Sequence, residues 1–121
     1  WNNARALELS AMAGAMFENY VVSEIIKGYA NNGMDIKSRL TYYRDNNGKE
    51  IDLMIFENGK LYPVEIKMSA DPGKKALKNY SILDSFQEET GEGAVLCMSS
   101  SVIPLDEKNK LIPIKAIWCG R

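Results

Sequence analysis

Four charged residues that could carry chemistry lie on two short hydrophobic runs joined by Asn58-Gly59. Asn-Gly between such runs predicts a two-residue hairpin turn, because both residues tolerate a positive φ. In that register Asp52 faces Glu65, and Glu50 faces Lys67. Side chains alternate along strands, so all four point to one face of the hairpin. The opposite face carries the apolar pairs Ile51 with Ile66, Leu53 with Val64 and Ile55 with Tyr62.

Two carboxylates opposed across a hairpin repel each other, because their Cβ atoms lie only about 5 Å apart. A bound cation or a raised pKa relieves the repulsion, and Mg²⁺ prefers carboxylate oxygens. Lys67, on the same strand face as Glu65, is placed to orient a water molecule or to stabilise developing phosphate charge. The alternative is that Glu50 pairs with Lys67 while Asp52 and Glu65 lie in water at the sheet margin. The register alone leaves both open, because one bulge at the turn would change the partners.

Glu18 places a charge in an apolar stripe of the helix expected near the N-terminus. Its neighbours at three, four and seven residues are Ala11, Gly14, Ala15, Val21, Val22 and Ile25. A buried, unpaired carboxylate is costly, so this pattern predicts a metal or lysine partner for Glu18. Alternatively, the stripe runs along the flank from Phe17 to Val21 and leaves Glu18 half exposed.

Basic and aromatic residues on either side of the hairpin are candidates for contacts with nucleic acid. These residues are Lys74, Lys75, Lys78, Tyr42, Tyr43 and Arg44. The lysines follow the second strand of the hairpin and could hold a phosphate backbone, although lysines on a solvated helix face are commoner. The aromatic and guanidinium groups could stack on bases or bind phosphate, although strand aromatics more often pack in the core.

The predicted elements that position these residues begin with one long helix and an antiparallel meander of three strands. The helix covers residues 4–29, and the strands cover residues 36–44, 50–56 and 61–68. A second helix is expected from Asp71-Pro72-Gly73 to Gly91, because proline favours the first helical position. A buried strand at 94–98 follows, and a final strand at 111–118 is placed at an edge because it carries Pro113. The fold class is therefore α/β: an α-β-β-β-α-β core with a mixed sheet flanked by helices.

Composition excludes several kinds of chemistry and of cellular setting. The 121 residues carry a formal net charge of −1 and form one domain. There are 0 His, which excludes Ser-His-Asp triads and His-ligated zinc. Cys97 and Cys119 are expected to be small apolar residues of a reducing cytoplasm, with a disulfide as the alternative. Without an apolar run of about 20 residues, we expect a soluble cytoplasmic domain. The first residue, Trp1, is typical of a piece of a longer chain.

Four motifs in this order resemble a known family. They are Gly14-Ala15-Met16-Phe17-Glu18-Asn19, Tyr42-Tyr43-Arg44-Asp45, Glu50-Ile51-Asp52-Leu53 and Pro63-Val64-Glu65-Ile66-Lys67. Over residues 13–98 the chain is similar to the domain of unknown function that follows the AAA+ ATPase module in many prokaryotic ATP-binding proteins. That domain in turn resembles the PD-(D/E)XK nuclease superfamily, whose fold is restriction-endonuclease-like.

The resemblance implies a role for each acidic residue and for the lysine. Asp52 and Glu65 would be ligands of Mg²⁺ or Mn²⁺, Glu18 would complete the metal site, and Lys67 would be the catalytic lysine. The implied reaction is hydrolysis of a phosphodiester by metal-activated water. The implied partners are nucleic acid, with DNA expected before RNA but both left open, and the N-terminal AAA+ ATPase module of the full-length protein. A homo-oligomer also fits, because two strands call for two such sites.

Three hypotheses remain at this point. The first is a metal-dependent nuclease domain accessory to the ATPase. The second is a catalytically silent module that binds nucleic acid without a metal ion. The third is a protein-interaction module that regulates the ATPase. ATP itself cannot bind here through a phosphate loop, because the sequence holds no G-x-x-x-x-G-K-[ST] motif, and no membrane partner is expected.

Overall fold

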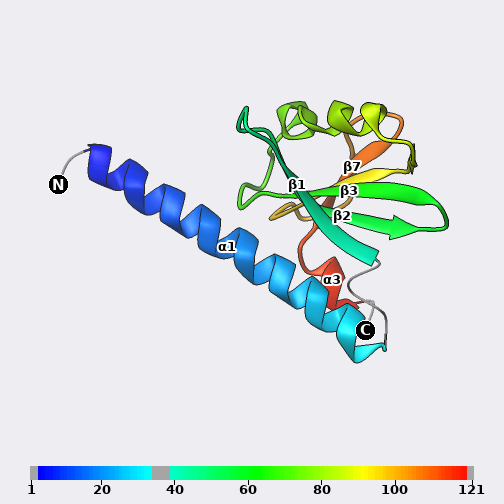
Figure 1. Cartoon of the computed structure of the whole chain (residues 1–121). Helices are drawn as coiled ribbons and strands as arrows, with labels where there is room; N and C mark the ends of the chain where they lie inside the picture. The colour runs from blue at the N-terminus through cyan, green and yellow to red at the C-terminus, as the bar shows by residue number, and fades with distance from the viewer. Residues whose placement is uncertain (1–2, 34–38, 120–121) are drawn as a thin grey trace.

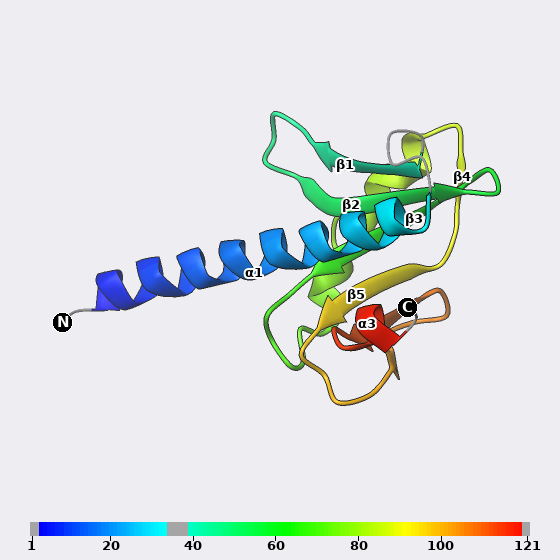
Figure 2. The same ribbon diagram turned by 90° about the horizontal axis from the view of Figure 1, so that it is seen from below.

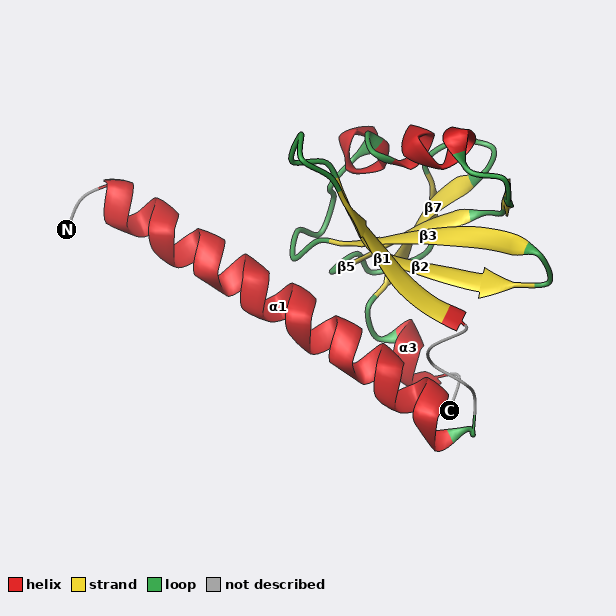
Figure 3. Cartoon of the chain, viewed as in Figure 1, coloured by secondary structure: helices red, strands yellow, loops and turns green. Residues whose placement is uncertain are grey.

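The computed structural model describes residues 3–33 and 39–119, and it is a mixed α/β fold in which a long helix precedes a mixed sheet (Figures 1 and 3). The elements are α1 (Asn3–Asn31), β1 (Leu40–Arg44), β2 (Glu50–Glu57), β3 (Lys60–Ile66), η1 (Lys74–Leu77), η2 (Tyr80–Ser85), β4 (Glu89–Thr90), β5 (Gly93–Cys97), β6 (Ile103–Pro104), β7 (Asn109–Pro113) and α3 (Ala116–Cys119). The helix predicted at residues 4–29 is confirmed. The first three residues of the strand predicted at 36–44 lie outside the described residues.

The sheet has the strand order β1-β2-β3-β5-β7-β6, and β4 pairs with β3. The meander β1-β2-β3 is antiparallel, as predicted, whereas β5 runs parallel to β3 and β7 runs parallel to β5. A parallel connection between β3 and β5 requires a crossover, and the segment of η1 and η2 provides it. The strand predicted at 94–98 is confirmed as β5.

Two hydrophobic layers hold the sheet between its helical covers. On one face, Val21 of α1 packs with Leu53, Val64, Ile66 and Leu96, and Ile117 of α3 joins them. On the other face, Tyr80 and Leu83 of η2 pack with strand residues of β2 and β3, while Ala76 of η1 packs with residues of β5 and β7. Helices α1 and α3 therefore cover one face, and η1 and η2 cover the other (Figures 1 and 2).

Helix α1 extends well beyond the sheet that it covers. Its N-terminal half projects past the rest of the fold in both views (Figures 1 and 2). Of its 29 residues only Val21 is buried. The helix ends at the Asn32-Gly33 signal, where Gly33 has φ 73° and the Asn32 side chain donates to the Gly28 carbonyl. The C-terminal half of α1 is thus the part that meets the core.

The β2–β3 hairpin has the turn and the register that Asn58-Gly59 predicts. Both turn residues have a positive φ, 53° and 78°. Leu53 pairs with Val64, and Glu57 pairs with Lys60. The predicted register is therefore confirmed over the part of the hairpin next to the turn.

One β-bulge changes which side chains share a face of the sheet at the end of this hairpin away from its turn. Between Thr41, which pairs with Met54, and Tyr43, which pairs with Ile51, β1 advances two residues while β2 advances three. The extra residue in β2 reverses the alternation there. Ile51 consequently packs with Met54 on the η2 face, and the prediction that it shares a face with Leu53 is wrong.

The helix predicted at residues 71–91 is also wrong. Short turns with i→i+3 hydrogen bonds replace it, for example from the Lys78 N–H to the Lys75 carbonyl at 3.2 Å. Gly73 enters the segment with φ 72°, and the Ser85 hydroxyl donates to the Ile82 carbonyl at 2.8 Å. Side chains that bond the local backbone compete with a continuous α-helix, so only two 3₁₀ turns form.

The last predicted strand is shorter than expected and does not lie at an edge. Strand β7 ends at Pro113 and is flanked by β5 and β6, so β6 is the edge strand. Pro113 is tolerated because β6 pairs only with Lys110 and Leu111, before the proline. Beyond it the chain turns into α3. Cys97 is a free cysteine buried in the core, as expected of a small apolar residue. No helix in the described part of the chain could span a membrane.

Candidate functional site

Asp52 and Glu65 meet where β2 and β3 stop pairing through their backbones. The Asp52 N–H donates to Glu65 Oε1 at 3.2 Å. The Ile66 N–H donates to Asp52 Oδ2 at 2.9 Å. Each carboxylate thus accepts a hydrogen bond from the opposite strand. Asp52 and Glu65 are therefore adjacent across the hairpin, as its register predicted.

This pair is buried enough to disfavour two negative charges. The Glu65 side chain is only 9% exposed, and Asp52 is half-buried. Burial, together with the neighbouring Asp52 charge, raises the pKa of Glu65 to about 8. Burial also raises the pKa of Asp52, although the bond from the Ile66 N–H opposes that change. The pair is suited to hold one proton or one cation between two carboxylates.

Lys67 supplies the positive charge of the site. Its Nζ lies 3.9 Å from Glu65 Oε2, and its side chain is 43% exposed. The Lys67 N–H donates to the Leu96 carbonyl at 2.9 Å, which fixes its backbone against β5. Burial raises the pKa of Glu65, Asp52 and Glu18, and the positive charge of the Lys67 ammonium opposes this rise. Glu50 pairs with Arg44 at 3.9 Å, so the alternative in which Glu50 pairs with Lys67 is not adopted.

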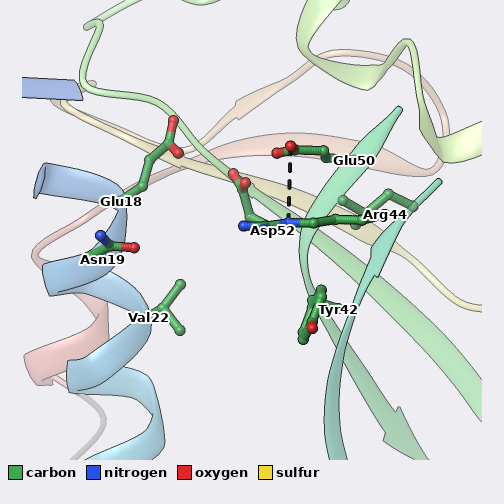
Figure 4. A pocket seen from close by; sticks show the side chains of 8 residues that line it. Glu18, Asn19, Val22, Tyr42, Arg44, Glu50 and Asp52 are labelled. Atoms are coloured by element: carbon green, nitrogen blue, oxygen red, sulfur yellow. Dashed lines mark ion pairs between the residues drawn. The ribbon is translucent and has the colours of Figure 1, made fainter. Parts of the chain in front are cut away.

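Glu18 reaches the same site from α1. Figure 4 shows Glu18 and Asp52 extending toward each other across the gap between the helix and β2. Glu18 is half-buried; burial raises its pKa, and the charge of Asp52 raises it further. Val21 anchors this part of α1 in the core. The helix therefore brings a third acid to face Asp52, and Glu18 is half exposed beside a stripe that runs through Phe17 and Val21, as in the alternative interpretation.

Asp52, Glu65 and Glu18 meet some of the requirements of a binding site for a divalent cation. Within residues 3–33 and 39–119, no three carboxylate or thiol side chains lie close enough together to enclose a metal ion. The adjacent Asp52 and Glu65 nevertheless offer the hard, anionic oxygen donors that Mg²⁺ and Mn²⁺ take. A cation would also relieve the cost of two buried charges in contact. Glu18 stands across the cleft from this pair.

A cleft of about 360 Å³ opens from the acids toward β1 (Figure 4). Its lining consists of Glu18, Asn19, Val22, Tyr42, Arg44, Glu50, Ile51 and Asp52. The Arg44 guanidinium lies over the Tyr42 ring, 5.5 Å from the ring centroid. Helix α1 forms one wall, and β1 with β2 forms the other.

A second pocket, of about 460 Å³, lies next to Lys67 at the start of η1. It is lined by Lys67, Ser69, Asp71, Pro72, Lys75, Ala76 and Lys78. Two of the three predicted phosphate-binding lysines are therefore brought beside the catalytic candidate. Lys74 is exposed outside this lining, and its charge acts on Asp106.

Tyr43 is the predicted contact residue that lies apart from the cleft. Its ring packs against Phe86, with centroids 6.1 Å apart, and its hydroxyl donates to Asp45 at 3.1 Å. Tyr42 lines the cleft instead, because neighbouring strand residues face opposite sides. Sequence reasoning missed Asn19 and Ser69. Only their places in the sequence could have indicated them: Asn19 directly follows Glu18, and Ser69 lies two residues after Lys67.

The fold and the site define a mixed α/β domain with a carboxylate–lysine centre at the end of a β-hairpin. The chain matches the family described as Domain of unknown function (DUF4143) over residues 13–117, and it belongs to that family. No curated protein and no solved structure matches the chain.

Proposed function

We propose that this chain is a metal-dependent nuclease domain of the restriction-endonuclease-like, PD-(D/E)XK type. It hydrolyses phosphodiesters of nucleic acid and is accessory to an AAA+ ATPase module of the full-length protein. The observation that carries the proposal is the buried Asp52–Glu65 pair with Lys67 Nζ 3.9 Å from Glu65. Buried acids of raised pKa beside a lysine, in a cleft, are typical of a catalytic centre.

Each residue of the centre has a distinct role in this reaction. Asp52 and Glu65 hold Mg²⁺ or Mn²⁺, which when bound lowers the pKa of water and neutralises phosphate charge. The Lys67 ammonium stabilises the negative charge that develops on the phosphate. Glu18, with its raised pKa, accepts or positions a proton of the attacking water from the opposite side of the cleft.

The surroundings of the centre support a polyanionic substrate. Lys75 and Lys78 line the pocket that Lys67 shares. The chain as a whole carries a formal charge of −1, so attraction to phosphate must come from this local group of cations. Lys74 adds charge to the same surface without lining the pocket.

A second candidate function is a catalytically silent module that binds a protein partner, namely the ATPase. Exposed apolar side chains on one side of α1 favour it: Leu9, Met12 and Met16 are 43–68% exposed. Scattered exposed apolar residues are common, but a row of them on one projecting helix is typical of contact surfaces. Partner binding through these residues is also compatible with an active centre, because they precede Glu18 along α1.

Cleavage of supercoiled and linear DNA with Mn²⁺ or Mg²⁺ tests the proposed nuclease. Wild type is compared with Lys67→Ala and with Lys60→Ala, a control at the other end of the same strand. We expect metal-dependent cutting that Lys67→Ala abolishes and Lys60→Ala retains. Equal cutting by all three preparations would indicate a contaminant. No cutting by wild type would instead leave the ATPase-binding module as the function to test, through direct association with the ATPase.

A further inference from the structure

We propose, on the basis of the proposed function, that the substrate is a single nucleic-acid strand. One unpaired base stacks on Tyr42 in the cleft between α1 and β1, while Lys75 and Lys78 hold a backbone phosphate on the other side of the acidic pair. The inference rests on the exposure of Tyr42, the different chemistry of the two pockets and their positions around the centre.

The Tyr42 ring belongs to neither hydrophobic layer, and the Arg44 guanidinium lies over it, 5.5 Å from the ring centroid. Tyr42 lies on edge strand β1 and is 64% exposed. The register shift between Thr41 and Tyr43 places Tyr42 at the bulge, opposite the two β2 residues Asp52 and Leu53. Figure 4 shows its ring on the strand wall of the cleft, with Val22 on the facing helix wall. An exposed ring of this kind offers a stacking platform to any base.

The cleft suits a base rather than a phosphate. Its charged lining is mostly acidic, with Glu18, Glu50 and Asp52 against the single cation Arg44, which already pairs with Glu50. A phosphate there would be repelled, whereas a neutral base would not. The volume of about 360 Å³ is that of a small-ligand site and does not admit a helix of stacked base pairs. Only an unpaired base presents its face to a side chain.

The second pocket has the opposite chemistry. Lys67, Lys75 and Lys78 supply three cations there against the one carboxylate of Asp71. Such a group suits a backbone phosphate. Asp52 lines the first pocket, and Lys67, whose Nζ lies 3.9 Å from Glu65, lines the second, so each pocket adjoins one acid of the pair. A strand that fills both pockets passes its phosphodiester over Asp52 and Glu65.

Fluorescence anisotropy in EDTA measures this binding apart from cleavage. The probes are a fluorescein-labelled 20-mer as single-stranded DNA, as single-stranded RNA and as DNA annealed to its complement. We expect both single strands to bind more tightly than the duplex, and the two single-strand arms show which backbone is preferred. Equal or tighter binding of the duplex, or no binding of any probe, would overturn the inference.

Variants locate the base and the phosphate. Tyr42→Ala is expected to weaken single-strand binding by about 5- to 150-fold, the loss of one stacked base. Tyr42→Phe should bind like wild type, and so should Tyr20→Ala, a control at an exposed tyrosine of α1. The double change Lys75→Ala with Lys78→Ala should reduce the salt slope of log K by about 1.4.

The variants also separate this inference from the nuclease proposal. A Tyr42→Ala protein that binds the single strand as well as Tyr20→Ala would overturn the stacking role, even if the wild type cuts DNA. Conversely, tight single-strand binding that depends on Tyr42 would stand even if Lys67→Ala showed no loss of cutting. Thermal unfolding of each variant checks that it is folded.

Discussion

The backbone N–H of Asp52 donates a hydrogen bond to the side chain of Glu65, at 3.2 Å. The carboxyl group of Glu65 is therefore held by the main chain of the opposite strand and cannot rotate away from Asp52 without losing that bond. The hairpin thus keeps two repelling acids in contact at the expense of stability. Such preorganisation is typical of a site that binds a cation or stabilises a transition state.

Glu65→Gln is expected to stabilise the metal-free protein. The glutamine amide oxygen can still accept from the Asp52 N–H. At pH 9, above the Glu65 pKa of about 8, the glutamine NH₂ group replaces a buried charge by a donor that faces the Asp52 carboxylate. We expect a gain on the order of 1 kcal/mol at that pH in EDTA. Mn²⁺ should raise the melting temperature of wild type and leave that of Glu65→Gln unchanged.

The control for this substitution is Glu88→Gln, at an exposed glutamate. Its melting temperature should match that of wild type both with and without Mn²⁺. A Glu65→Gln protein that unfolds earlier than wild type in EDTA, or that Mn²⁺ still stabilises fully, would contradict the role given to Glu65.

Glu18→Gln is expected to reduce cleavage without unfolding the protein. Glu18 faces Asp52 across the cleft and is not part of either hydrophobic layer. Losing a positioned group that accepts a proton typically costs about 10²- to 10⁴-fold in rate. The measurement is the initial rate of DNA cleavage at saturating Mn²⁺, with Glu8→Gln on the exposed part of the same helix as the control. Equal rates for both variants would remove Glu18 from the site.

The hairpin and the first helix could be predicted from sequence because their signals are local. Asn58-Gly59 determines a turn, and the turn determines which residues of the two strands are paired. Glu18 could be found because one charge interrupts an apolar periodicity. The bulge opposite Tyr42 could not be predicted, since it depends on how β1 and β2 pair after folding. The sequence therefore offered both Tyr42 and Tyr43 as contact residues, and the structure turns Tyr43 to the core.

The remaining errors arise from tertiary context. Ala76, Tyr80 and Leu83 have a helical spacing, and all three are buried against the sheet. Two 3₁₀ turns place them there as well as a helix would, so the spacing alone could not distinguish the two. Pro113 indicated an edge strand, yet the edge is formed by Ile103 and Pro104, a two-residue strand too short to predict.

Gly93→Ala is expected to destabilise the protein by about 1–3 kcal/mol. An added Cβ would collide with the Asn109 amide oxygen and would lie 2.8 Å from Cε2 of Tyr80. Urea unfolding measures the change. Gly14→Ala is the matched control: nothing lies within 4 Å of an added Cβ on α1, and alanine should stabilise the helix by about 0.5–1 kcal/mol. Similar effects at both positions would contradict the packing described around Gly93.

The melting temperature of the protein should fall in acid, because the Asp106 carboxylate becomes protonated. This carboxylate accepts from the N–H groups of Lys108 and Asn109, each at 2.8 Å, and the Lys108 bond is the main cause of its lowered pKa. A folded pKa below 3.8 means that its stabilisation is complete above that pH and is lost as the pH falls through the folded value. Asp106→Asn should therefore lose less melting temperature than wild type between pH 6 and pH 3. Parallel losses would contradict this assignment.

Helix α1 is anchored in the core through Val21, so local unfolding of this helix changes the composition of the site. A helix with one fully buried residue and a long free half is held by much less free energy than the central strands, so amide hydrogen exchange should open it first. Opening removes Glu18 and one wall of the cleft while Asp52, Glu65 and Lys67 stay on the intact hairpin. Any partner that clamps the free half of α1 would then regulate the centre by mass action, without touching it.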